Sequence, residues 1–206
     1  MKETLNATLC LLLLAGAGEL SAQTREGFWI GFGLGWASIS ASCDDVTSGT
    51  GFCDAVGERQ GAFAAYLMAG GTLNPHLRLG GEVYNFIGFR ELAGGTASGD
   101  STLTIGNNLA LALYYYPMVE RGLFFKGGVG TAFYVEAKSE NLDWEVWGLG
   151  LLLGAGYDLR IGRTISLTPL FTFGWGGGGD LKSQGVPVGQ NWSHAYFSLA
   201  LGLTFH

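Results

Sequence analysis

The chain of 206 residues is short enough for a single domain, but its composition differs from that of a typical water-soluble protein. Hydrophobic residues make up 48% and charged residues only 14%, which favours a membrane protein. The 36 glycines argue against long membrane-spanning helices, and the formal charge of -6 argues against a nucleic-acid partner. The apolar residues must therefore follow some other membrane-compatible pattern.

The N-terminal segment, residues 1–22, has the parts of a signal peptide. A basic start precedes an apolar stretch at residues 9–17, and small residues follow before the expected cleavage point. The apolar stretch is too short to cross about 30 Å of hydrocarbon, which takes about 20 residues. We therefore expect an exported chain whose mature domain covers residues 23–206.

Two cysteines, Cys43 and Cys53, remain once that segment is removed. An oxidising compartment favours a disulfide between them, and so short a loop would gain somewhat under about 3 kcal/mol. The alternative is a metal site with Asp44, Asp45 and Asp54, but no second cysteine or histidine pair lies nearby to complete tetrahedral coordination. We expect the disulfide, no metal and no cofactor.

Apolar residues recur at every second position along the mature chain, which is the period of a β-strand. In the last such segment, Phe197, Leu199 and Leu201 alternate with Ser198, Ala200 and Gly202. Eight segments share this pattern: residues 28–36, 63–73, 77–89, 103–115, 123–135, 147–159, 165–175 and 195–205. The second is the weakest, and either of its faces can be the apolar one.

Three features favour a membrane barrel over a soluble β-sandwich. The segments have about the 9–11 residues that a tilted transmembrane strand needs. Short connections at residues 74–76, 118–122 and 160–163 alternate with longer polar ones at 41–59, 91–100, 139–143 and 176–191. Outward aromatic residues form two girdles: Trp36, Phe89, Trp147 and Trp175 near the long loops, and Tyr115, Phe125, Tyr157 and Phe205 near the short turns.

These features predict an all-β fold, an eight-stranded antiparallel up-and-down transmembrane barrel. Closure is required because hydrocarbon offers no partner for the polar groups of an open sheet edge. Pro169 removes a backbone donor in the middle of a strand, which predicts a bulge there.

Residues 113–117 (Leu-Tyr-Tyr-Tyr-Pro), residues 122–130 and the closing strand resemble the OmpA/OmpX-like small outer-membrane barrels, within the outer membrane protein β-barrel domain family. The resemblance implies an integral protein of the bacterial outer membrane. The girdles and the alternation of short turns with longer loops predict that both termini are periplasmic, and we expect a monomer. The resemblance also implies a terminal signal for the barrel-assembly machinery, formed here by Ser198, Ala200, Leu203 and Phe205. The sequence departs from that signal at Ala200, where glycine is commoner, and at His206, which follows the terminal aromatic residue.

The barrel interior would hold a charge network of Arg78, Glu82, Lys126, Glu136 and Asp158, because buried charges must be paired. One interpretation is a salt-bridged plug, and the alternative is a narrow pore for ions or small solutes. A lipid A-modifying enzyme is a third hypothesis. His194 and Ser198 share a strand face but would lie about 13 Å apart, too far for a nucleophile–base pair.

The hypothesis that we favour from sequence is a non-enzymatic barrel with an envelope-structural or surface-interaction role. Its partners would be outer-membrane lipid and lipopolysaccharide, reached through extracellular loops. Those loops carry many acidic residues: Asp44, Asp45, Asp54, Glu58, Glu91, Asp100, Glu140 and Asp143.

Overall fold

The computed structural model describes residues 27–45, 59–91, 101–138, 141–183 and 186–206, so the predicted signal peptide lies outside the described residues. No helix within these ranges is long and apolar enough to cross a membrane. The strands are β1 Phe28–Asp45, β2 Gln60–Asn74, β3 Leu77–Glu91, β4 Ser101–Tyr115, β5 Leu123–Lys138, β6 Asn141–Tyr157, β7 Leu159–Arg160, β8 Ile165–Ser183 and β9 Val186–Phe205.

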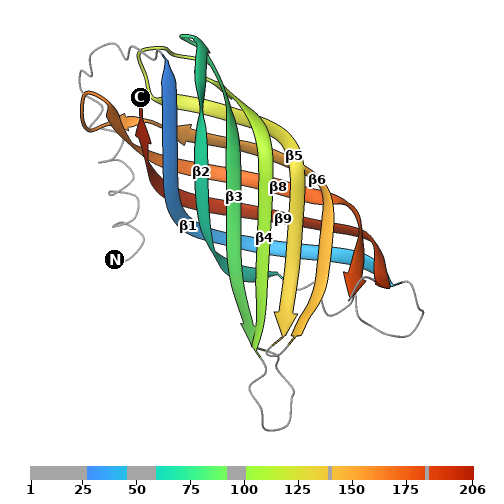
Figure 1. Ribbon diagram of the computed structural model, residues 1–206. Coiled ribbons are helices and arrows are strands. Elements are labelled where there is room, and N and C mark those ends of the chain that lie inside the picture. Colours follow the sequence, from blue (N-terminus) through green and yellow to red (C-terminus); the bar gives the residue numbers. More distant parts are fainter. Residues whose placement is uncertain (1–26, 46–58, 92–100, 139–140, 184–185) are drawn as a thin grey trace, which may run out of the picture.

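The strands close into an antiparallel barrel. Each strand from β1 to β6 pairs with its neighbours along the chain, while β1 also pairs with β9 and β6 with β8. The two-residue β7 follows β6 and pairs with β8, so eight strands surround the interior. Figure 1 shows the tilted cylinder, with the C-terminus and the short connections at its upper end. The predicted fold class is confirmed.

Side chains alternate between an apolar outer surface and a filled interior. In β1, Phe32, Leu34 and Trp36 face outward, while Trp29 is buried inside. In β2, the sequence left the facing open. The structure places Phe63 and Leu67 outside, 52% and 47% exposed, and Tyr66 and Met68 inside.

Beyond Trp36 the even-numbered residues of β1 still face outward, but they change from apolar to polar. Ser38, Ser40 and Ser42 face outward, while Ala37, Ile39 and Ala41 face the interior. A strand that leaves the hydrocarbon for water presents polar residues on its outer face. The change in polarity after Trp36 therefore indicates where the apolar belt ends, and the barrel extends past it toward the long loops.

The predicted long loop at residues 176–191 is wrong, because β8 continues to Ser183 and β9 begins at Val186. The glycine run forms a bulged hairpin instead. The pairing register shifts between Gly177 and Gly179, and Gly178 and Asn191 have positive φ angles of 85° and 52°. Glycine accepts this backbone conformation without a steric penalty, so the hairpin twists but continues. The expected loops at 41–59 and 139–143 are likewise partly strand, since β1 reaches Asp45 and β6 starts at Asn141.

The bulge predicted at Pro169 is also wrong. Pro169 pairs with Leu201 in regular register, and no shift occurs there. The pairing of β8 with its other neighbour is interrupted instead. β6 pairs with β8 up to Gly156↔Leu170, and β7 continues this pairing in the same register from Leu159↔Leu167. Proline lacks the N–H group that a continuous ladder needs, so it lies beside a gap in the ladder instead of a bulge.

Candidate functional site

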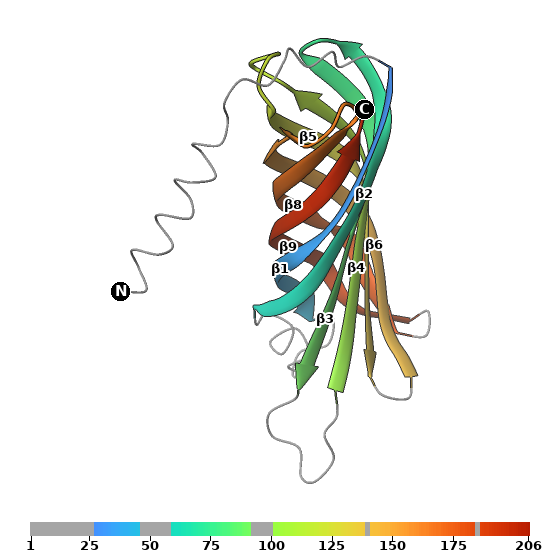
Figure 2. The same ribbon diagram turned by 90° about the vertical axis from the view of Figure 1, so that its left-hand side faces the viewer.

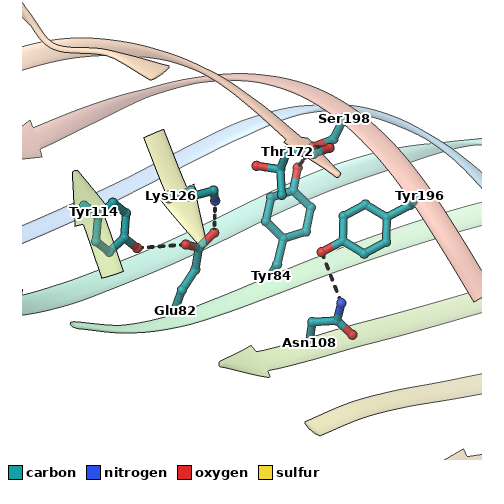
Figure 3. A network of polar contacts seen from close by, with 8 residues as sticks. All are labelled: Glu82, Tyr84, Asn108, Tyr114, Lys126, Thr172, Tyr196 and Ser198. Carbon is teal, nitrogen blue, oxygen red and sulfur yellow. Dashed lines mark hydrogen bonds and ion pairs between the residues drawn. The ribbon is translucent and has the colours of Figure 1, made fainter. Parts of the chain in front are cut away.

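The centre of the barrel holds an ion pair. Glu82 of β3 and Lys126 of β5 contact each other through Oε1 and Nζ, and both side chains are fully buried. Tyr114 of β4, which lies between them in the sheet, donates its hydroxyl to the other carboxylate oxygen of Glu82 at 2.8 Å. Figure 3 shows these three side chains pointing toward one another. A buried carboxylate is thus satisfied on both oxygens, as its low-dielectric surroundings require.

A second group of polar contacts lies beside this pair and crosses the barrel. Tyr84 of β3 donates its hydroxyl to Ser198 of β9, whose own hydroxyl points to the backbone oxygen of Thr172 on β8 at 3.4 Å. Asn108 of β4 donates to the hydroxyl of Tyr196 on β9 at 3.3 Å. The rings of Tyr84 and Tyr196 stack with centroids 5.1 Å apart (Figure 3). The contacts connect opposite sides of the barrel through its interior.

A third group closes the short-turn end. Arg78 contacts the hydroxyl of Tyr116 at 3.2 Å and Nδ1 of His206 at 2.9 Å. Tyr116 in turn donates to Asp158 at 2.9 Å, and Thr168 donates to the other Asp158 oxygen at 2.9 Å. Tyr116 therefore connects the cation and the anion.

Aromatic rings fill the interior toward the long loops. Phe86 and Tyr134 each lie 5.8 Å from the ring of His194, measured between centroids. Trp192 packs on Tyr134 at 4.5 Å. A Cβ added at Gly106 would lie 1.8 Å from the ring of Phe86, so this inward glycine makes room for the aromatic filling.

Together these groups form a packed interior rather than an open lumen. Glu82, Tyr84, Phe86, Asn108 and Tyr196 each have 0% of their surface exposed. In a water-filled channel, side chains that line the lumen would remain accessible to solvent. The described part of the barrel is therefore closed at the level of these residues.

The predicted charge network is divided between two of these groups. Glu82 and Lys126 meet at the centre, whereas Arg78 and Asp158 belong to the short-turn end. The side chain of Glu136 lies outside the part of the structure that is described. Cys43 is half-buried beside the interior cluster, and Cys53 lies outside the described residues, so their disulfide stays a prediction.

The girdle residues share one surface of the barrel, whereas the assembly-signal residues are divided between the two surfaces. The described aromatic side chains of the girdles face outward: Trp36, Trp147, Trp175, Tyr115, Phe125, Tyr157 and Phe205. Phe89 lies in β3, but its side chain is not described. In the closing strand, Ser198 and Ala200 face the interior while Leu203 and Phe205 face outward.

The sequence analysis missed several interior partners. Tyr114, Tyr116 and Asn108 lie on inward positions of β4 or just beyond it, and strand parity alone would have identified their facing. No feature of the sequence indicated that His206 has interior partners. Its backbone N–H donates to Thr164 at 2.9 Å, and its ring lies between Arg78 and Ser166.

The side chains of His194 and Ser198, the candidate base and nucleophile, contact other residues. The His194 ring is buried against Phe86 and Tyr134, and Ser198 bonds to Tyr84 and to the backbone of Thr172. Among the described residues, no group of three His, Cys, Asp or Glu side chains is placed to hold a metal ion.

A closed antiparallel barrel with an apolar outer belt and a packed polar interior defines an integral barrel of the outer-membrane type. The chain belongs to the outer membrane protein beta-barrel domain family, whose model matches residues 7–159. That family places the protein in the bacterial outer membrane. A search of curated protein sequences gave no match.

Solved outer-membrane proteins share the fold at low sequence identity. The attachment invasion locus protein Ail of Yersinia pestis, in complex with the heparin analogue sucrose octasulfate, is 9% identical, with a TM-score of 0.55 over 87% of this chain and 99% of that one. OprG of Pseudomonas aeruginosa is 12% identical, with a TM-score of 0.52 over 90% and 100%. Neisserial surface protein A is 15% identical, with a TM-score of 0.50 over 87% and 96%. At these identities, the likeness concerns the fold alone.

Proposed function

We propose that this protein is a closed, non-enzymatic outer-membrane barrel that holds its long loops at the cell surface for envelope-structural or surface interactions. The observation that carries the proposal is the complete burial of Glu82, Tyr84 and Phe86 across the barrel interior. A barrel whose interior is filled by packed, hydrogen-bonded side chains is rigid, which suits a membrane anchor. The same filling disfavours the narrow pore.

The proposed orientation places both termini in the periplasm and the long loops outside. Small outer-membrane barrels have short periplasmic turns and longer extracellular loops. Here the short turns lie at the end that carries the C-terminus and the start of β1 (Figure 2), and β1, β8 and β9 extend past the apolar belt at the opposite end. The outward serines beyond Trp36 suit a strand that enters water on the loop side.

The loop-side charge favours cationic partners. Of the eight acidic residues already named, Asp44, Asp45, Glu91 and Asp143 lie in the long-loop ends of strands and the others in the connecting segments of the sequence. Asp44 is exposed beside Asn191, which donates to it at 2.9 Å. Such a surface attracts basic groups, or divalent cations that bridge to the phosphates of lipopolysaccharide. It repels polyanions, so a sulfated ligand of the kind seen with Ail does not suit this chain.

A non-enzymatic role is supported by the packing of the candidate catalytic groups. A nucleophile and its base need to lie within hydrogen-bond reach. Ser198 is instead engaged by Tyr84, while His194 is enclosed by aromatic rings. Release of fatty acyl chains from lipopolysaccharide by the purified protein would overturn this part of the proposal.

Single-channel recording in planar lipid bilayers tests the closed barrel against the pore. We expect no stepwise current from the wild-type protein. A Tyr84→Ala/Tyr196→Ala variant, which removes two stacked rings from the filling, should conduct and serves as the matched positive control. Steady single-channel steps from the wild type would contradict the proposal.

The detergent sensitivity of whole cells tests the surface role. In the native host, replacing the eight acidic residues by Asn or Gln should raise detergent sensitivity as strongly as deletion of the protein does. The exposed lipid-facing substitution Leu149→Ala is the control and should leave resistance unchanged. If deletion of the protein changed neither envelope integrity nor adhesion, the role would be excluded.

A further inference from the structure

The lipid-facing wall of the barrel carries a pair of asparagines. Asn85 of β3 and Asn107 of β4 are partners in the strand register, and both side chains lie on the outward face. Nδ2 of Asn107 donates to Oδ1 of Asn85. Figure 1 shows the two strands side by side. Apolar outward residues lie on both sides of the pair along each strand: Val83 and Ile87 on β3, and Ile105 and Leu109 on β4. The pair therefore lies within the apolar belt rather than at its edge.

The two amides are too deep in the belt to reach water. Asn85 lies four residues from the predicted girdle position Phe89, about 13 Å along the strand at about 3.3 Å per residue. With a strand tilt of about 35–45°, this distance corresponds to about 10 Å of depth. The long side chains of lysine and arginine can extend to a membrane boundary, but asparagine has a single methylene group and cannot.

The one hydrogen bond leaves much of the bonding capacity of the two amides unused. Within the described ranges, Nδ2 of Asn85 and Oδ1 of Asn107 have no hydrogen-bond partner. Hydrocarbon supplies none, so both groups carry an energetic penalty there. Between the girdles, the only other polar side chain on the outward face of the described strands is that of Thr131 on the adjacent β5. The polar groups of the lipid-facing wall are thus confined to one face.

A second copy of the chain would supply the missing partners. Two copies in one membrane have the same orientation, so a two-fold axis that relates them runs along the membrane normal, and their contacts are reciprocal. If the axis passes between β3 and β4, Asn85 of each copy faces Asn107 of the other. Nδ2 of each Asn85 can then donate to Oδ1 of the facing Asn107. The four amides form a closed ring in which each amide donates once and accepts once.

The outer surface around the pair suits the same two-fold contact. On the β2 side of the axis the outward residues are small, and they include Ala65, Ala69, Gly71 and Gly81. A Cβ added at Gly71 or Gly81 would meet nothing within 4 Å. On the β4 side Leu109 and Leu111 protrude, 53% and 59% exposed. The two-fold axis places the leucine side of each copy against the small side of the other, and small residues allow the close approach on which association within a membrane depends.

We propose that this protein forms a two-fold homodimer in the membrane, through the face of β2 to β5 and a ring of four amides from Asn85 and Asn107. The proposal replaces the monomer expected from the sequence. It depends neither on the packing of the barrel interior nor on which end of the barrel faces outward.

Energy transfer between labelled copies in lipid vesicles tests the homodimer. Donor-labelled and acceptor-labelled wild-type chains in phosphatidylcholine vesicles should show transfer that decreases as lipid is added. Asn85→Leu/Asn107→Leu removes the amide ring and should lower the association constant about tenfold, because each of two hydrogen bonds between the copies contributes a few-fold in a membrane. Leu199→Ala, which shortens an exposed leucine of β9 on the opposite wall, is the control and should leave the association constant unchanged.

Gly81→Leu provides a second test that keeps both asparagines. The added side chain enters open space in the single copy, so the barrel should fold, but it occupies the small side of the contact and should also weaken the dimer about tenfold or more. A wild type that stays monomeric at every protein-to-lipid ratio would overturn the proposal, even if the asparagine pair bound a different membrane protein. A dimer that Asn85→Leu/Asn107→Leu leaves at wild-type strength would overturn it as well.

Discussion

Neutralising one member of the central ion pair should destabilise the barrel strongly. Glu82→Gln leaves the ammonium group of Lys126 buried without its anion, and both side chains are fully buried in the native protein. Removing one partner of a buried pair costs about 3–5 kcal/mol, because the remaining charge stays desolvated. The amide of Gln still accepts the hydroxyl of Tyr114, so the loss comes from the charge rather than from that hydrogen bond.

Equilibrium urea unfolding from lipid vesicles, followed by tryptophan fluorescence, measures this loss. The Glu82→Gln/Lys126→Met double variant should recover part of it, because an uncharged interior removes the desolvation penalty of the remaining ion. Lys182→Met, which removes an exposed lysine, is the control and should change the free energy of unfolding by less than about 0.5 kcal/mol. The reasoning would be refuted if each single substitution lowered the free energy of unfolding by less than about 1 kcal/mol and the two losses were additive in the double variant.

Two further predictions concern packing and the C-terminus. Gly106→Ala should lower the free energy of unfolding by about 1–3 kcal/mol because its Cβ collides with Phe86, whereas Gly81→Ala meets nothing within 4 Å and should be nearly neutral. Equal effects of the two changes in the urea assay would exclude this packing. His206→Ala removes the imidazole that Arg78 contacts and should cost about 1–3 kcal/mol in the same assay, while a wild-type midpoint would contradict a structural role for His206.

Much of this architecture could be predicted from strand periodicity, because hydrocarbon on one side and a packed interior on the other impose opposite demands on neighbouring residues. The facing of β1 and of the closing strand followed directly. In β2, alanines and glycines occur on both faces, so polarity alone left two choices, and only the inward burial of Tyr66 and Met68 decides between them.

The errors in the loop predictions arose where the barrel leaves the membrane. Past the belt the outward residues turn polar, so Ser42 and the glycine run of β8 were assigned to loops although they form strands. The partition of the interior charges depends on strand register and tilt across the whole barrel. The connection from Arg78 through Tyr116 to Asp158 joins residues far apart in the sequence, so no local sequence pattern predicts it.

Water access to the barrel interior tests the central claim most directly. Thr172 is buried with none of its surface exposed, and Asp180 lies exposed on the same strand near the long loops. In a background without other cysteines, the protein is reconstituted in vesicles and treated with a membrane-impermeant maleimide, after Thr172→Cys or Asp180→Cys substitution. A closed barrel should leave the Thr172→Cys thiol unlabelled while the Asp180→Cys thiol reacts fully. Labelling of both thiols at similar rates would show a water-filled lumen and contradict the closed barrel.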